Sequence, residues 1–382
     1  MREARHVIYL IACCGMAVYG MILALPGTVI GLPQFTARFG LSLADRGIFI
    51  AALFGSLLVG SAVSGAIVDH AGYRISIAGS MLAFVLLLPL FALAPSYPLT
   101  LAALAGLGFV SAPLNTAANA LSSELFPEER GRRMTGLAIA FGVGGLSMPA
   151  AAAFVSWQAV VIGGAVVSAA IAQRALNAGA TGGHLSAPSL DSVRRFLGQE
   201  RFVWFCLLLV CDAANETAFA GWTSSYLSAS GLSARVATLG LSLHWFGLVV
   251  GRVMFAGRVD RNKRAAIVRG GLTGAGILLV MIAVPIPPVL IAGPFAAGVA
   301  VGVVLATSLA LAGDRYPGNA GSLFGLLLTM AQVGGIVLPP LIGVVAEAIG
   351  LRLAMSLVAL NGVAIAVLAW LAGPQVESRS LV

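Results

Sequence analysis

Apolar runs as long as a membrane-spanning helix recur along the whole chain of 382 residues, and no other feature constrains the fold as strongly. Inside a bilayer, only helices and closed barrels satisfy all of their backbone polar groups. The runs show little alternation of apolar and polar residues, which excludes barrel strands. The chain is 59% hydrophobic and only 9% charged, too few polar residues for the surface of a soluble protein. The sequence therefore predicts an all-α integral membrane protein.

Twelve membrane-spanning helices are expected, and the longest polar stretch, rich in Gly, Ser and charge, lies between the sixth and the seventh. This stretch, 177–200, links a predicted N-terminal bundle of six helices, 1–176, to a predicted C-terminal bundle of six, 201–382. The expected spans are 7–33, 46–68, 74–94, 98–123, 133–155, 157–176, 201–228, 234–257, 263–284, 287–312, 319–346 and 351–373.

The basic residues predict the orientation. With the N-terminus in the cytoplasm, only Arg38, Arg46, Arg235 and Arg352 of the 22 basic residues fall on the outer side. The remainder, Arg252 among them, fall in cytoplasmic loops or at their membrane edges. The positive-inside rule then places both termini in the cytoplasm of a multi-pass protein of the bacterial inner membrane. The net charge of +8 is thus a topology signal in a lipid bilayer, and we expect no nucleic-acid partner.

An internal repeat relates the two halves. ELFPEERGRRMTGLAIAFGVGGLSMP, from Glu124, aligns with DRYPGNAGSLFGLLLTMAQVGGIVLP, from Asp314, at a constant spacing of 190 residues (314 − 124). Asp69 and Asp260 match at a spacing of 191 residues (260 − 69). Parallel repeats of this kind are related by an axis along the membrane normal, with the substrate site near the midplane between them. The aligned pairs are Glu124 with Asp314, Pro127 with Pro317, Gly131 with Gly321, Gly144 with Gly334, Gly145 with Gly335, and Pro149 with Pro339.

A motif follows the second expected span. GAIVDHAGYR, from Gly65 to Arg74, resembles the signature G-x-x-x-D-[RK]-x-G-[RK]-[RK] of the major facilitator superfamily, with His70 and Tyr73 as departures. A degraded copy, GRVDRNKR, follows the eighth span. The resemblance implies the major facilitator fold, two pseudo-symmetric six-helix bundles in a monomer that transports a small molecule by alternating access.

The motif also implies gating. Asp69 lies at a helix end, where it can meet the positive end of a neighbouring helix or a loop arginine in one state and release it in another. The alternative is that these charges only end helices and anchor the topology. The gating candidates are Asp69, Arg74, Glu124, Arg130, Arg133, Asp260, Arg264, Asp314 and Arg315.

A narrower resemblance concerns two segments. NTAANALSSELFPEERGRRM, from Asn115 to Met134, and CDAANETAFAGWTSSYL, from Cys211 to Leu227, are similar to the fourth and seventh helices of the fucose/glucose–proton symporter group. The resemblance implies sugar transport coupled to protons. The first expected helix departs from that group's pattern, because it contains no Asp or Glu.

Two acids fall near the middle of the seventh expected span. Asp212 and Glu216 share one helix face at a spacing of four residues, and two like charges that close disfavour simultaneous ionisation. Ionisable groups inside a membrane normally serve ion or substrate pathways. We therefore expect proton coupling by Glu216, Asp212 and His244, a relay partner in the eighth span. Alternatively, an acid pairs with an arginine or caps a bend, and His244 bonds a backbone carbonyl.

Polar and aromatic side chains in several spans are candidates for substrate binding. Amides suit hydroxyl-rich substrates, and aromatic planes stack against sugar rings. The same side chains also serve as packing contacts between helices or as belt residues at the membrane boundary. The candidates are Asn115, Asn119, Trp222, Tyr226, Gln332 and Tyr19.

The favoured function is secondary active transport of a small polar solute, a sugar or a similar compound, coupled to protons. A second hypothesis is a proton-antiporting exporter of cationic or amphipathic compounds, since two acids with no certain cation suit a cationic substrate. A third is a receptor or scaffold that has lost transport. The sequence shows no nucleotide, metal or nucleophile motif, so we expect no enzyme activity and no cofactor.

Overall fold

The computed structural model describes residues 2–126, 128–178, 198–199, 201–255, 262–316 and 320–372. The regular elements of these residues are helices, as the composition predicts. The first group is α1 (Arg2–Ile30), α2 (Pro33–Phe39), α3 (Leu43–Leu93), α4 (Tyr97–Leu125), α5 (Arg130–Ala152) and α6 (Trp157–Asn177). The second is α8 (Phe202–Ala229), α9 (Ala234–Phe255), α10 (Lys263–Ala283), α11 (Pro287–Val301), α12 (Val304–Arg315), α13 (Ala320–Ile349), α14 (Leu351–Ala354) and α15 (Ser356–Ala372).

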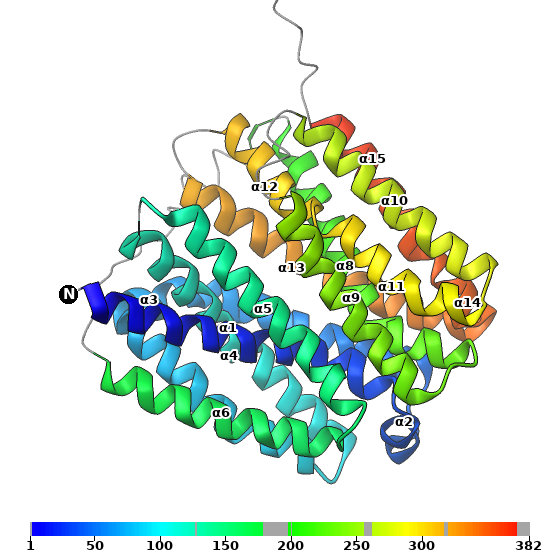
Figure 1. The fold of residues 1–382 in the computed structure, drawn as a ribbon, viewed down its shortest axis with the longest axis horizontal. Coiled ribbons are helices and arrows are strands. Elements are labelled where there is room, and N and C mark those ends of the chain that lie inside the picture. The colour runs from blue at the N-terminus through cyan, green and yellow to red at the C-terminus, as the bar shows by residue number, and fades with distance from the viewer. Residues whose placement is uncertain are drawn as a thin grey trace, which may run out of the picture.

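The helices form two bundles side by side. In Figure 1, α1–α6 lie together in blue to green, and α8–α15 lie together in green to red. Within the described residues, 11 helices are long and apolar enough to cross a membrane. The expected all-α membrane fold is therefore confirmed. Most of the expected linker, 177–200, lies outside the described residues.

The helix α3 accounts for the difference between 11 helices and twelve expected spans. It has 51 residues, and a straight helix of that length would extend ~77 Å, more than twice the hydrocarbon thickness. Its dihedral angles are helical except at Gly72, with φ 76° and ψ 166°, a conformation that favours glycine. Gly72 belongs to the motif GAIVDHAGYR, so this motif contains the break between two membrane-spanning arms.

Another expected span is interrupted in its middle. The span predicted at 287–312 consists of α11 and α12, which Gly302 and Val303 separate. Pro287 and Pro288 occupy the first positions of α11, where a proline replaces an amide that has no partner within the helix. The span as a whole, Pro287–Arg315, retains the length needed to cross a bilayer.

The repeat is visible in how the bundles meet. Gly145 of α5 faces Trp245 of α9, and a Cβ added to this glycine would lie 2.6 Å from the indole ring. Gly335 of α13 faces Phe54 of α3, and its added Cβ would lie 2.7 Å from the phenyl ring. The glycines are 190 residues apart, and the aromatic residues are 191 apart (245 − 54). The two glycine–aromatic pairs therefore join the bundles by pseudo-symmetric contacts.

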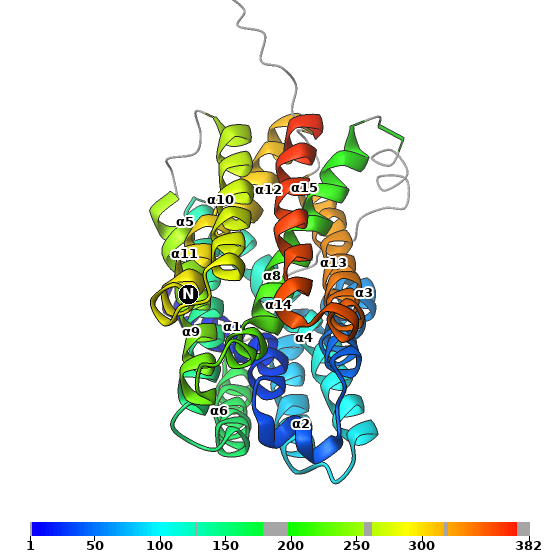
Figure 2. The same ribbon diagram turned by 90° about the vertical axis from the view of Figure 1, so that its right-hand side faces the viewer.

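Further contacts between the bundles gather where α2 lies, an end of the molecule that we call the α2 end (Figure 2). Helices α1, α5, α8 and α13 finish at this end, and polar contacts connect the bundles there. They are Ser225 Oγ to the Ile30 carbonyl at 3.2 Å, Ala44 N to Glu347 Oε1 at 3.1 Å, and Arg235 Nε to the Ala153 carbonyl at 3.1 Å. These contacts hold the bundles together at the α2 end.

Substitutions at two glycines of α3 test how closely the bundles approach each other. A Cβ at Gly47 would lie 2.6 Å from the Pro339 carbonyl oxygen and 2.6 Å from Pro340 Cα, both in the opposite bundle. A Cβ at Gly55 meets no atom within 4 Å. We expect Gly47→Ala to destabilise the purified protein by about 1–3 kcal/mol, the usual cost of overpacking. Gly55→Ala should leave the thermal midpoint unchanged, and equal midpoints for both variants would contradict the close approach.

Candidate functional site

A cavity of about 430 Å³ lies between the two bundles, within the ~300–1,000 Å³ range of small-molecule sites. Helices α1, α3, α4 and α5 line one side, and α8, α9, α12 and α13 line the other. It reaches Met134, near the start of α5, and Arg252, near the end of α9. The cavity is therefore placed between the two halves of the repeat, where the repeat predicts a substrate site.

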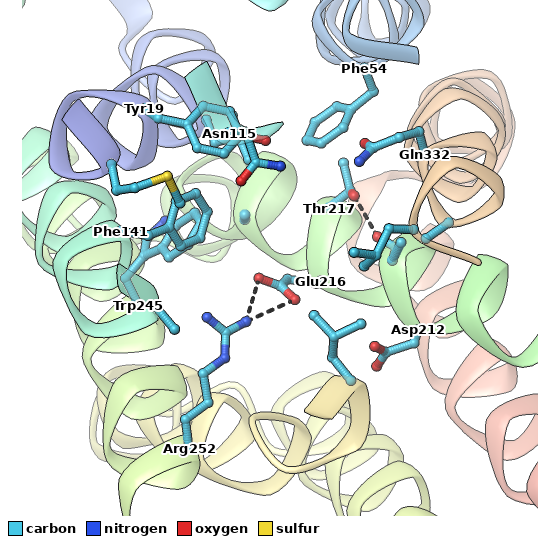
Figure 3. A pocket seen from close by; sticks show the side chains of 18 of the residues that line it. Tyr19, Phe54, Asn115, Phe141, Asp212, Glu216, Thr217, Trp245, Arg252 and Gln332 are labelled. Carbon is cyan, nitrogen blue, oxygen red and sulfur yellow. Dashed lines mark hydrogen bonds and ion pairs between the residues drawn. The ribbon is translucent and has the colours of Figure 1, made fainter. Parts of the chain in front are cut away.

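Glu216 projects into this cavity from α8 and forms an ion pair with Arg252 of α9 (Figure 3). Arg252 Nη2 lies 3.1 Å from Glu216 Oε1 and 3.3 Å from Oε2. The Arg252 side chain is 17% exposed and that of Glu216 is 22% exposed. Partial burial removes part of the water from both charges, so each depends on the other for stabilisation.

Asp212 lies one helical turn before Glu216 and also lines the cavity. It is only 4% exposed, and its Oδ2 accepts no hydrogen bond from a described residue. A buried carboxylate oxygen without a donor is costly unless a proton or a ligand reaches it. The two acids therefore differ, since Glu216 has a basic partner whereas Asp212 Oδ2 is buried without a described donor.

Amide side chains from both bundles reach the cavity. Asn119 donates from Nδ2 to the backbone oxygen and to Oδ1 of Asn115, both at 2.9 Å, which leaves Nδ2 of Asn115 available. Gln332 of α13 lies on the opposite side (Figure 3). Amide donors from the two bundles can therefore form hydrogen bonds with the same solute.

Aromatic rings form much of the apolar wall. Tyr19 and Phe141 lie with their ring centroids 5.2 Å apart, and Phe141 meets Trp245 edge-on at 5.6 Å. Phe54 faces them from α3 (Figure 3). Trp245 is 2% exposed, and its Nε1 donates to no described residue. The wall thus combines stacking surfaces with one unused N–H donor.

The structure does not place His244 beside Glu216. Its ring is fully buried, stacks on Phe219 at 4.8 Å, and has Nδ1 3.3 Å from the carbonyl oxygen of Pro294. His244 is not among the residues that line the cavity. This arrangement corresponds to the alternative expectation for His244, a hydrogen bond to a backbone carbonyl.

Trp222 and Tyr226 also lie away from the cavity. Trp222 is fully buried and donates from Nε1 to the carbonyl of Pro339 at 3.2 Å. Tyr226 is 1% exposed and donates its hydroxyl to the carbonyl of Met281 at 2.8 Å. Both aromatic residues join helices inside the C-terminal bundle, because α8 turns this face toward α13 and α10 rather than toward the cavity.

The gating candidates of the N-terminal bundle make contacts inside that bundle. Arg74 donates to the carbonyls of Leu176 and Ala178 at the end of α6, at 3.2 and 2.8 Å. Arg133 pairs with Glu129 at 2.9 Å and lies over the ring of Phe126. Asp69 Oδ1 is buried without a described partner, Glu124 is exposed, and the side chain of Arg130 lies outside the described residues.

The gating candidates of the C-terminal bundle that form described contacts also form them inside their own bundle. Asp314 pairs with Lys263 of α10 at 2.6 Å, and Arg264 lies over the ring of Trp370 at 5.2 Å. Arg315 is exposed, and Asp260 lies outside the described residues. Each of these contacts thus stays within one bundle.

Arg252 is the charged cavity residue that the sequence reasoning missed, and the rings of Phe54, Phe141 and Trp245 also lie outside the predicted set. The positive-inside rule assigns Arg252 to a membrane edge, because it lies three residues before the end of α9. Its spacing from Trp245 is seven residues, two helical turns, which puts both on one helix face. That spacing, on the helix that follows the two acids, is the signal that could have identified it.

The family model of the Major Facilitator Superfamily matches residues 8–211 and again 204–381, one match for each half. A search of curated proteins finds no match. The solved structures that resemble the chain include a D-xylose–proton symporter, with a TM-score of 0.80, 14% identity, and coverage of 98% of this chain and 99% of that one.

Two other structures are similar over nearly the full length. A bacterial homologue of the human lysosomal transporter Spinster, in an inward-facing and occupied conformation, has a TM-score of 0.80 and 14% identity, covering 97% of both chains. A mutant of the nucleoside transporter NupG has a TM-score of 0.79 and 14% identity, covering 96% of this chain and 99% of that one. With two family matches over a two-bundle helical fold, the chain belongs to the major facilitator superfamily and is a membrane transporter.

Proposed function

We propose that the chain is a secondary active transporter that moves a small polar solute, a sugar or a similar compound, together with protons across the bacterial inner membrane. The observation that carries the proposal is the cavity between the bundles, where two acids and one guanidinium lie within a largely apolar wall. Charged groups at membrane depth are costly and mark ion or substrate pathways. The similarity to a D-xylose–proton symporter supports the same class of transport.

In this proposal Glu216 and Asp212 carry the protons. Protonation of Glu216 removes its charge and weakens the bond to Arg252, so it changes the interaction between α8 and α9. Asn115 and Gln332 bind solute hydroxyls from opposite bundles, and the ring of Tyr19 offers a stacking surface. His244, Trp222 and Tyr226 have structural roles, as their backbone hydrogen bonds indicate.

The exporter hypothesis loses part of its support in this cavity. It depended on two acids with no certain cation, an arrangement that would attract a cationic substrate. Arg252 supplies that cation and already pairs with Glu216. With two acids and one guanidinium the formal charge of the cavity is −1 rather than −2, so it favours a positively charged solute less than the two acids alone suggested.

Alternating access follows from where the bundles touch. If the N-terminus is cytoplasmic, as the basic residues predict, the α2 end faces outward and its contacts close the outer side. The cavity then reaches toward the cytoplasm, an inward-facing arrangement. We propose that Asp69, Arg74, Arg133 and Asp314 change partners when the outer side opens, consistent with the contacts they make within single bundles here.

Neutralising Glu216 tests the coupling. In proteoliposomes with an imposed proton gradient, Glu216→Gln should abolish accumulation of the transported solute and leave solute exchange intact, because glutamine cannot release a proton. Glu128→Gln, at an exposed residue between α4 and α5, is the matched control and should accumulate solute normally. Normal accumulation by Glu216→Gln would show that the coupling assignment is wrong.

Locking the α2 end tests alternating access. Ala44 and Glu347 touch across the bundles, so a bifunctional thiol reagent with a reducible spacer should cross-link cysteines at both positions, in a chain with Cys13, Cys14, Cys206 and Cys211 replaced by serine. The cross-link should reduce transport at least about ten-fold, and reduction should restore it, since the cavity could no longer open at that end. The variant with Ala44→Cys alone should be unaffected by the reagent. Unchanged transport by the cross-linked protein would contradict rocking of the bundles.

A further inference from the structure

The guanidinium of Arg252 is only partly used by Glu216. Both contacts come from Nη2, while Nη1 and Nε donate to no described residue. In Figure 3 the second terminal nitrogen lies on the side of the cavity bordered by Trp245 and Phe141. The strongest arginine–carboxylate geometry uses two nitrogens and two oxygens in parallel, which Glu216 does not achieve. A carboxylate that arrives from the cavity can take Nη1 and Nη2 together.

Two other buried groups in the cavity lack partners among the described residues. Asp212 Oδ2 is an open acceptor, and Trp245 Nε1 is an open donor. Their residues are 4% and 2% exposed, so little bulk water reaches these groups. Buried polar groups are normally hydrogen-bonded, and both residues line the cavity, so a ligand bound there can complete both groups when these side chains adjust to it. The ligand must both donate and accept.

The shape of the remaining wall limits the rest of the ligand. Tyr19, Phe54 and Phe141 present rings, whereas Asn115 and Gln332 present amides from opposite sides. Rings of this kind cover the apolar faces of a sugar, and amides bond its hydroxyls. A small ring that has hydroxyl groups and one charged end fits this combination.

We infer that the transported solute is a hydroxylated carboxylate of the sugar-acid class, with its carboxylate on Nη1 and Nη2 of Arg252 and a hydroxyl donated to Asp212 Oδ2. The inference rests on the proposed transport function and specifies its substrate. Trp245 Nε1 donates to the same carboxylate or to a ring oxygen of the solute. A neutral sugar would leave the free side of Arg252 without an anion.

Binding of such an anion would also require a proton to bind to the protein. The incoming carboxylate replaces Glu216 on Arg252, so Glu216 remains as an anion near Asp212 with no cation. A carboxylate in that position takes up a proton. The titratable or charged groups that face Glu216 are Asp212 on its own helix, Arg252 on α9 and Tyr19 on α1. The described cavity residues of α3, α4, α5, α12 and α13 carry no titratable group. One anion therefore enters with one proton.

Calorimetry on the purified full-length chain tests the inference with matched pairs of ligands, glucuronate with glucose and galacturonate with galactose. At least one uronate should bind about ten-fold or more tightly than its hexose, because a charge-assisted bidentate contact replaces a neutral one. Repeating the titration in buffers of different ionisation enthalpy should give an uptake of about one proton per bound uronate.

Substitutions separate the roles of Arg252 and Glu216. Arg252→Lys should weaken uronate binding about ten-fold or more, and much more than it weakens hexose binding, since lysine cannot form the two-nitrogen contact with a carboxylate. Arg38→Lys, at α2 and outside the cavity, is the matched control, and the melting temperature of each variant reports folding. Glu216→Gln should retain uronate binding and lose the proton uptake.

Several results would overturn the inference. Hexoses that bind as tightly as their uronates, or uronate binding without proton uptake by the unmodified chain, contradict it even if Arg252→Lys fails to fold. If a hexose, but no uronate, accumulates in proteoliposomes under a proton gradient, the carboxylate inference is wrong and the proposed transport stands. If a uronate binds in an Arg252-dependent manner but is never accumulated, the carboxylate-binding site stands, and both coupled transport and the identity of the transported solute are wrong.

Discussion

A charge at membrane depth needs an opposite charge, a proton or a ligand, and the arrangement of this cavity depends on that requirement. Glu216 and Arg252 meet this requirement for each other across α8 and α9. Asp212 does not, since its Oδ2 has no described donor. The bundles supply the enclosure in which this difference matters, because apolar helices on both sides keep water scarce and make each unpaired charge expensive.

The same requirement explains why the two halves, although similar in fold, differ in the cavity. The glycine–aromatic pairs Gly145 with Trp245 and Gly335 with Phe54 repeat across the pseudo-symmetry axis. Asp212 and Glu216 have no acidic counterparts in α1, where residues 22 and 26 are Ile22 and Pro26. The scaffold can be symmetric because packing uses small and apolar residues, whereas a second set of buried charges would add to the desolvation cost.

Length and hydropathy predict the spans well, since the bilayer sets the length of a helix that crosses it. The break at Gly72 falls at an expected boundary between spans, although the helical geometry continues on both sides of it. Helix periodicity also brings Asp212 and Glu216 to one face. The cavity is harder to predict, because a helix surrounded by other helices is buried on most faces. Trp222 and Tyr226 are therefore buried within the C-terminal bundle, although they are polar enough to suit a substrate site.

Arg252 shows a second limit of prediction from sequence, since the positive-inside rule counts basic residues near a helix end and takes no account of the direction of their side chains.

The glycine–aromatic pairs have a consequence for the evolution of the family. Each pair has one ring seated on one backbone, so a larger residue at Gly145 is tolerated only with a smaller one at position 245, and likewise for Gly335 and position 54. Substitutions in relatives should therefore occur jointly within each pair and independently between the two pairs.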